Sequence, residues 1–156
     1  MSQSVVSNAS PLIALHQIGQ LEILPHLFDL IQIPTAVAQE INSVQPLPSW
    51  IQVHRLNQPI GARILQASLG AGESGAIALA LELEAPRILL DDRPARRLAQ
   101  ALGFPIIGTV GLLSAAKKRG LLKELRPSLN ALKEHHFYIA DHLYEMSLRD
   151  AGEISD

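Results

Sequence analysis

The sequence predicts an α/β fold with three layers (α/β/α), in which helices cover both faces of a central parallel sheet of four or five strands. Short runs of Val, Ile and Leu alternate along the chain with longer segments that have the apolar spacing of helices. Several short runs are apolar throughout, which is typical of parallel strands buried on both faces. Hydrophobic residues make up 47% of the chain and aromatic residues only 4%, which indicates a core of Leu, Ile, Val and Ala.

Two strands and three helices are expected in the first part of the chain. Ser10 and Pro11 predict a helix start, with Ser10 as the N-cap and Pro11 as the first helical residue. Gly19 ends this helix. The expected elements are a strand over residues 5–8, a helix over 11–18, a short helix over 21–28, a strand over 30–34 and a helix over 35–41.

The rest of the chain continues this alternation after a loop marked by Pro46 and Pro48. Gly103 and Gly120 close two of its helices. The expected elements are an exposed or edge strand over 50–56, helices over 58–69 and within 69–85, a strand over 87–92, a helix over 93–104, a strand over 105–109, a helix over 110–120, and two final helices around a short strand or turn over 137–140.

Composition excludes several classes of protein. The 156 residues fit one domain, 1–156, on which residues 121–156 are expected to pack as a C-terminal helical extension. The absence of cysteine excludes a disulfide scaffold, a thiolate zinc site and a cysteine nucleophile. No segment approaches the roughly 18 apolar residues of a membrane span, so we expect a cytoplasmic protein without membrane contact. The net charge of −2 means that any binding of nucleic acid must be local.

Polar side chains follow three of the predicted strands. Asn8 and Ser10 come after the first strand, Asp91 and Asp92 after the apolar run "ILL", and Thr109 after "PIIG". Because the carboxyl ends of parallel strands meet at one edge of a sheet, we expect these side chains to lie close together.

Glu40 and Glu73 lie on helices that can face the same edge. Carboxylates that share a crevice repel one another unless a cation compensates them, and Mg²⁺ or Mn²⁺ prefers such oxygen ligands. A site of this kind is suited to phosphodiester hydrolysis. Each acid also has a structural interpretation: Asp91 and Asp92 as an N-cap and first-turn acid, Glu73 as a partner of the helix dipole, and Glu40 as a solvated side chain.

The segments that carry these residues resemble PIN domains, of the small prokaryotic kind that includes VapC-like toxins, and more narrowly an uncharacterised PIN-like subfamily. Together they cover nearly the whole chain in order. The matching segments are "VVSNASPLIALHQIGQLEILP", "IQIPTAVAQEI", "LGAGESGAIALALELEA", "ILLDDRPARRLAQALGFPIIGTVGLLSAAKKRGLL" and "FYIADHLYEMSLRDAGE".

This resemblance implies a parallel sheet flanked by helices and a ribonuclease site of three or four acids with Mg²⁺ or Mn²⁺. The acid positions fall on Asn8, Glu40, Glu73, and Asp91 or Asp92, with Ser10 and Thr109 at hydroxyl positions beside the metal. The predicted metal ligands are Asn8, Glu73, Asp91 and Asp92.

Two of these positions are special. At the first position the family usually has aspartate, and Asn8 offers an amide oxygen without negative charge, which should lower metal affinity. At the last position two criteria disagree. The distance to the following helix favours Asp92, whereas the strand end "LLDD" favours Asp91.

Other polar features carry weaker signals. Arg93 and Arg96 follow the acidic pair and are candidates for contacts to an RNA backbone. Residues 117–119 form a second basic cluster, whose position at a helix end also complements the helix dipole. The histidines, His135 and His136 among them, lack the spacing of zinc sites and are interpreted as surface or capping residues. No phosphate-binding glycine motif is present, which disfavours a nucleotide-binding Rossmann domain.

Three functional hypotheses follow. The leading one is a metal-dependent endoribonuclease resembling the toxin of a toxin–antitoxin pair, with RNA as substrate and a small antitoxin occluding the acidic crevice. The second is a PIN-fold module without catalysis that binds RNA or a protein, with Asn8 marking loss of the metal site. The third is a generic α/β domain whose acids are helix caps. The resemblance also implies a homodimer.

Overall fold

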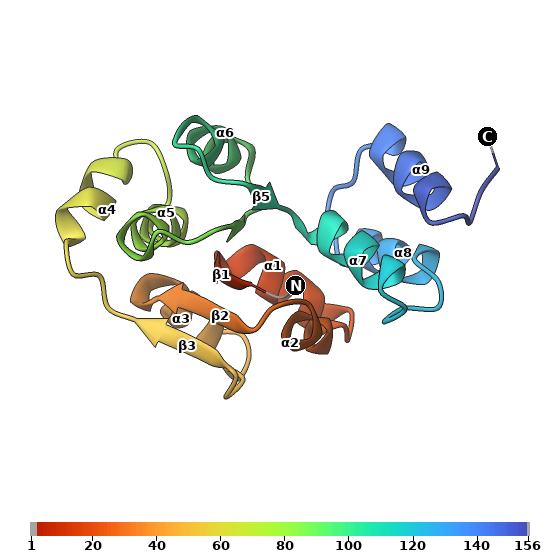
Figure 1. Cartoon of the computed structure of the whole chain (residues 1–156), viewed down its shortest axis with the longest axis horizontal. Helices are drawn as coiled ribbons and strands as arrows, with labels where there is room; N and C mark the ends of the chain where they lie inside the picture. Colours follow the sequence, from red (N-terminus) through yellow and green to blue (C-terminus); the bar gives the residue numbers. More distant parts are fainter. Residues whose placement is uncertain (1–2, 156) are drawn as a thin grey trace.

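The computed structural model describes residues 3–155, which form a five-stranded parallel sheet between layers of helices (Figure 1). The strand order is β3-β2-β1-β4-β5, and every neighbouring pair is parallel. The predicted three-layer α/β/α class is therefore confirmed. β3 lies at the edge of the sheet, which confirms the exposed or edge strand expected over residues 50–56, and two of its residues are exposed.

Strands and helices alternate through the first two-thirds of the chain, and helices alone complete it. The elements in order are β1 (Ser4–Ser7), α1 (Ala9–Gln17), η1 (Leu21–Ile23), α2 (Leu24–Leu27), β2 (Leu30–Pro34), α3 (Thr35–Asn42), β3 (Ile51–His54), α4 (Pro59–Leu65), α5 (Ala71–Leu83), β4 (Ile88–Leu89), α6 (Arg93–Ala101), β5 (Ile106–Ile107), α7 (Thr109–Lys118), α8 (Arg126–Glu134) and α9 (Asp141–Asp150).

The strand order reverses at β1, which pairs with β2 on one side and β4 on the other. Ser7 is in register with Leu89, and the Asn8 N–H donates to the Leu89 carbonyl oxygen at 3.0 Å. In open α/β sheets, ligands bind outside the carboxyl ends of the strands at such a reversal. The fold therefore places Asn8 beside the segment that follows β4.

Successive residues of one strand supply the cores on opposite faces of the sheet. Val5 and Leu89 belong to the larger buried cluster, which includes side chains of α1, α3 and α7. Val6 and Ile88 belong to the smaller cluster, with side chains of α5 and α6. This division follows from the alternation of side chains along a strand, and it explains why both strands are apolar throughout.

The last two helices contribute to the larger core. Leu129 of α8 and Leu148 of α9 are buried in it, and both helices lie at the end of the molecule away from α4 (Figure 1). The Glu153 carboxylate accepts hydrogen bonds from the backbone N–H groups of Leu125 and Arg126, at 2.6 and 3.0 Å. The segment after α9 thus satisfies N–H groups at the start of α8.

The first helix begins earlier than predicted, so Ser10 as its N-cap was wrong. Asn8 is the N-cap residue, Ala9 is the first helical residue, and Pro11 lies within the first turn. Proline is tolerated there because the first N–H groups of a helix have no intrahelical acceptor. The Ser10 hydroxyl donates instead to the Asp91 carboxylate at 3.2 Å.

Two smaller predictions also differ from the structure. Residues 137–140 form neither a strand nor a helix, and α4 ends at Leu65, well before residue 69. No helix within residues 3–155 has the length and apolar character needed to cross a membrane.

Candidate functional site

A pocket of about 360 Å³ opens at the carboxyl end of β1. It brings together Asn8, Ser10, Glu40 and Glu73, four of the residues selected from the sequence. Its opposite wall comes from much later in the chain and consists of His135, His136 and Phe137.

Asn8 occupies the most buried polar position of this pocket. Only 3% of its surface is exposed, and its backbone N–H is held by β4. The Oδ1 atom of its side chain is buried and has no hydrogen-bond partner among the described residues. Burying an acceptor without a partner costs about 1–3 kcal/mol, so the fold retains Asn8 in an unfavourable environment.

Glycines at the start of α5 make room for the acidic side chains. A Cβ atom added to Gly72 would lie 3.0 Å from Asn8 Oδ1 and closer still to Glu40 Oε1. One added to Gly70 would lie 3.1 Å from Glu73 Oε1. The oxygens of Asn8 and Glu40 therefore face the same spot on the α5 backbone, which only glycine leaves open.

The pKa of Glu40 is raised above its usual value. Desolvation is the larger cause, and the negative charge of Glu73 adds to it, while a hydrogen bond from the Gly72 N–H lowers the pKa in part. Two carboxylates and an unpaired amide oxygen thus share one pocket that has no lysine or arginine in its lining.

Replacing Glu40 by Gln should stabilise the metal-free protein near neutral pH. Because the folded pKa of Glu40 lies above its reference value of 4.5, the native state holds the proton of this carboxyl group to a higher pH than the unfolded state does, and the ionised form destabilises the native state. The stability contributed by this proton is complete below pH 4.5 and is lost as the pH rises through the raised pKa. In EDTA, Glu40→Gln should have a higher Tm than the wild type at pH 7, and the difference should vanish in acid. The control is Glu22→Gln, at an exposed acid; identical Tm–pH curves for wild type and Glu40→Gln would refute this prediction.

Asp91 and Asp92 have different roles in the structure. The carboxylate of Asp91 accepts hydrogen bonds from the Thr109 N–H and Thr109 Oγ1, both at 2.7 Å, and from Ser10 Oγ. The carboxylate of Asp92 accepts from the Ala95 N–H at 3.2 Å and caps α6. Asp91 therefore connects the first turns of α1 and α7, whereas Asp92 serves the helix that it precedes.

Removing either aspartate should lower the free energy of unfolding, by different amounts. Asp92→Ala removes an N-cap, which costs about 1 kcal/mol. Asp91→Ala leaves the N–H and hydroxyl of Thr109 without their acceptor, and Thr109 is fully buried, so we expect a loss of about 2 kcal/mol or more. Urea unfolding of the two variants measures both values, and a larger loss for Asp92→Ala would contradict the assignment.

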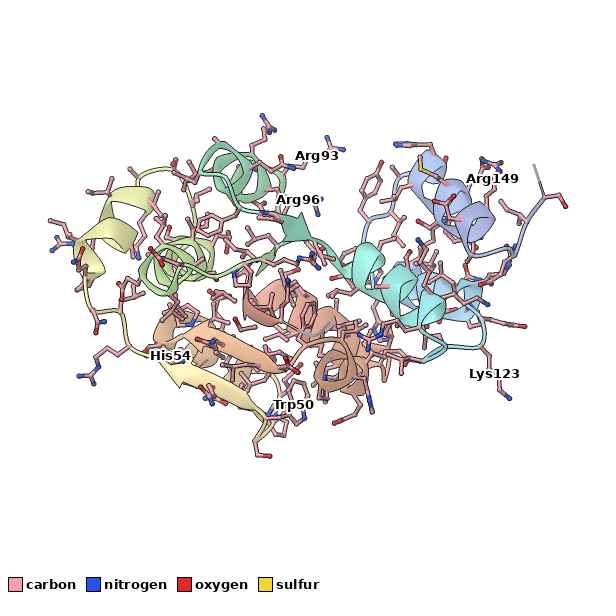
Figure 2. The ribbon with its side chains drawn as sticks, viewed as in Figure 1. Trp50, His54, Arg93, Arg96, Lys123 and Arg149 are labelled. Atoms are coloured by element: carbon pink, nitrogen blue, oxygen red, sulfur yellow. The ribbon has the colours of Figure 1, made fainter. Side chains whose placement is uncertain are left out.

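The basic side chains selected from the sequence differ in their exposure and in their hydrogen bonds and ion pairs. Arg93 is exposed at the start of α6, and Arg96 lies closer to the sheet, where its Nη1 donates to the Leu90 carbonyl oxygen at 3.1 Å (Figure 2). Lys117 is paired with Glu153 at 3.6 Å, which favours a structural role for this lysine.

The side chains of the acidic pocket are of the types that bind a hard cation, but they do not form a complete coordination sphere. Amide and carboxylate oxygens are the ligands that Mg²⁺ and Mn²⁺ prefer, and the unpaired Asn8 Oδ1 beside Glu40 lacks a positive partner. Among residues 3–155, however, no three acidic, histidine or cysteine side chains converge closely enough to hold an ion. Asp91 is turned toward Thr109, and Asp92 toward α6.

The sequence did not predict that residues 135–137 line the acidic pocket. His135 and His136 are exposed at the end of α8, as the surface interpretation had it, but they also line the acidic pocket. His136 has a φ of 66°, a left-handed conformation that is uncommon for residues other than glycine. Nothing in the residue types of this segment indicated the left-handed backbone of His136 or its position beside the acidic pocket.

The all-parallel five-stranded sheet defines an α/β fold, and polar residues follow its neighbouring strands β1 and β4: Asn8, Asp91 and Asp92. A family model described as PIN domain matches residues 4–153, and the chain belongs to this family. The PIN domain is a nuclease fold, and PIN domains generally use divalent metals. A search of curated proteins found no match to the chain.

Proposed function

We propose that this protein is a divalent metal-dependent endoribonuclease and that the pocket of Asn8, Glu40 and Glu73 is its active site. One observation carries the proposal: the buried, unpaired Oδ1 of Asn8 faces the same point as the Glu40 carboxylate, beside a second carboxylate. Oxygens of this kind crowd together at a structural cost unless a cation joins them.

Asn8, Glu40 and Glu73 would hold Mg²⁺ or Mn²⁺. The ion supplies an activated water and neutralises charge on the phosphate. Asp91 acts as a positioning residue, because its carboxylate accepts hydrogen bonds from Thr109 and from Ser10, and Ser10 lines the pocket. Asp92, predicted as a metal ligand, has no place in this proposal because its carboxylate caps α6.

The RNA strand would approach past the first turn of α6. Arg93 is exposed there and can contact a phosphate, while Arg96 already donates to a backbone carbonyl. In this proposal Arg93 provides a contact that strengthens RNA binding without selecting a base.

The test is cleavage of a structured RNA by the purified wild type with Mn²⁺ and with excess EDTA. We expect cleavage with Mn²⁺ and none with EDTA. Cleavage that persists unchanged in EDTA would contradict metal dependence, and a lack of cleavage with both Mn²⁺ and Mg²⁺ would contradict the proposed activity.

A second candidate is a PIN-fold binding module without catalysis. It is favoured by the neutral side chain at Asn8 and by the lack of three converging acids among the described residues. This candidate predicts binding of RNA or a protein without cleavage, also after restoration of an acid by Asn8→Asp.

The finer role that we propose is that of a toxin inhibited by a small antitoxin that covers the acidic pocket, acting as a homodimer in the cytoplasm. Its support is the resemblance to small prokaryotic PIN domains and the exposure of Glu40 at the pocket.

A further inference from the structure

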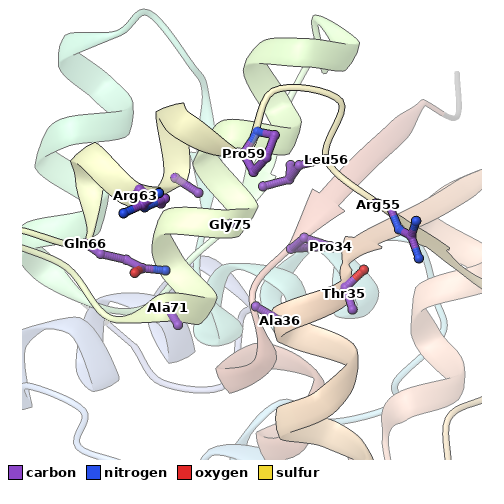
Figure 3. A pocket seen from close by; sticks show the side chains of 11 residues that line it. Pro34, Thr35, Ala36, Arg55, Leu56, Pro59, Arg63, Gln66, Ala71 and Gly75 are labelled. Carbon is purple, nitrogen blue, oxygen red and sulfur yellow. The ribbon is translucent and has the colours of Figure 1, made fainter.

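We propose that a second pocket, between α4 and the first turns of α3 and α5, binds an unpaired base of the RNA strand. This pocket has a volume of about 380 Å³, and none of its lining residues lines the acidic pocket. Figure 3 shows its side chains. The inference rests on the proposed ribonuclease function and adds to it a separate subsite for one base of the RNA strand.

The floor of this base pocket is apolar. Its members are five apolar side chains and one glycine: Pro34, Ala36, Leu56, Pro59, Ala62 and Gly75. Pockets that bind small molecules are built in this way, with volumes of about 300–1,000 Å³ and few polar groups. A nucleobase inserted between apolar side chains is stabilised by burial and van der Waals contacts that are largely independent of its identity.

Two arginines give the base pocket its charge. Arg55 and Arg63 are exposed, lie on opposite sides of the pocket (Figure 3), and form no ion pair within residues 3–155. No acidic side chain lines the pocket. Its occupant should therefore combine an apolar body with negative charge on both sides, as a base between two phosphates does.

The base pocket and the acidic pocket share two helices. Ala36 of α3 and Ala71 of α5 line the base pocket, while Glu40 of α3 and Glu73 of α5 line the acidic pocket. Gly70, Ala71 and Gly72 form the beginning of α5, next to both pockets. Ala71 is exposed and has only a small side chain, so a nucleic acid strand can pass over this turn. The positive end of the α5 dipole lies at this turn and favours a phosphate there, and one of its N–H groups, that of Gly72, already donates to Glu40.

This shared turn favours RNA over a protein side chain as the occupant. A strand whose scissile phosphate lies at Glu73 carries its own neighbouring bases and phosphates to the base pocket. A protein side chain would meet the apolar floor but would leave the two arginines without negative partners.

The test measures binding in EDTA, so that it does not depend on cleavage. The probe is a fluorescein-labelled single-stranded oligoribonucleotide of about ten nucleotides, compared by anisotropy with an abasic chain of equal length. We expect the wild type to bind the base-bearing probe about tenfold more tightly than the abasic probe. Ala71→Leu, which fills the mouth of the pocket at an exposed position, should abolish this preference.

Matched variants separate the base from the charges. Ala101→Leu makes the same change at an exposed site on α6, and should bind like the wild type. Arg63→Gln should weaken binding of both probes and reduce the slope of log affinity against log salt by about 0.7, whereas Arg119→Gln should change neither. Each variant must keep the Tm of the wild type.

Equal binding of the two probes by the wild type, or an unchanged preference in Ala71→Leu, would overturn the base pocket. These results are independent of the proposed nuclease function. Base-dependent binding without any cleavage would refute that function and leave the base pocket intact, and cleavage without base-dependent binding would refute the base pocket alone.

Discussion

Glu73→Gln is expected to lower Mn²⁺-dependent RNA cleavage about 100-fold or more without unfolding the protein. Glu73 lines the acidic pocket from the first turn of α5, and its charge already raises the pKa of Glu40. The substitution keeps the shape and removes one of two carboxylates available to a cation. Metal ions contribute several kcal/mol to such reactions, and each 1.4 kcal/mol corresponds to about tenfold in rate.

The control for this experiment is Glu22→Gln, which removes an exposed carboxylate from η1. It should cleave RNA at the rate of the wild type. Thermal unfolding in EDTA adds a second readout, because Glu73→Gln also relieves the repulsion of Glu40 and should not lower the Tm. A Glu73→Gln variant as active as Glu22→Gln would exclude the acidic pocket as the catalytic site.

Asn8→Asp should increase the affinity for Mn²⁺ by about tenfold or more. The side chain is nearly fully buried, and its Oδ1 faces the same point as Glu40 Oε1. A carboxylate there adds a full negative charge at a short distance from the ion, which is worth one to a few kcal/mol at the effective dielectric of a protein surface. Calorimetric titration of Mn²⁺ into wild type and Asn8→Asp measures the difference.

The same substitution should destabilise the metal-free protein. Without a cation, a third carboxylate joins Glu40 and Glu73, so the Tm of Asn8→Asp in EDTA should lie below that of the wild type. Saturating Mn²⁺ should reverse the order, because binding to the native state stabilises it. An Asn8→Asp variant whose Tm is the same with EDTA and with Mn²⁺ would show that the pocket holds no ion.

Much of the fold was predictable because its strands are local apolar runs. Val5 and Val6 face opposite cores, and this burial on both sides is what makes their segment apolar throughout. The start of α1 was predicted less well. Ser10 has the right residue type for an N-cap, but its hydroxyl donates a hydrogen bond to Asp91, which lies far along the chain.

The candidate site was predictable in its residue types and not in its contacts. Two adjacent aspartates in one loop cannot be told apart by spacing, and only the structure shows that Asp92 caps α6 while Asp91 holds Thr109. The turn of His135 and His136 meets the pocket through long-range packing of α8, for which the sequence has no local pattern.

The central claim is that the pocket of Asn8, Glu40 and Glu73 binds the metal that RNA cleavage requires. The most direct test is the cleavage rate as a function of Mn²⁺ concentration, for wild type and Asn8→Asp on the same structured RNA. We predict that both cleave, and that Asn8→Asp reaches half of its maximal rate at a lower Mn²⁺ concentration. The claim would be contradicted if the wild type cleaved no RNA. It would also be contradicted if a folded Asn8→Asp variant cleaved no RNA at any Mn²⁺ concentration.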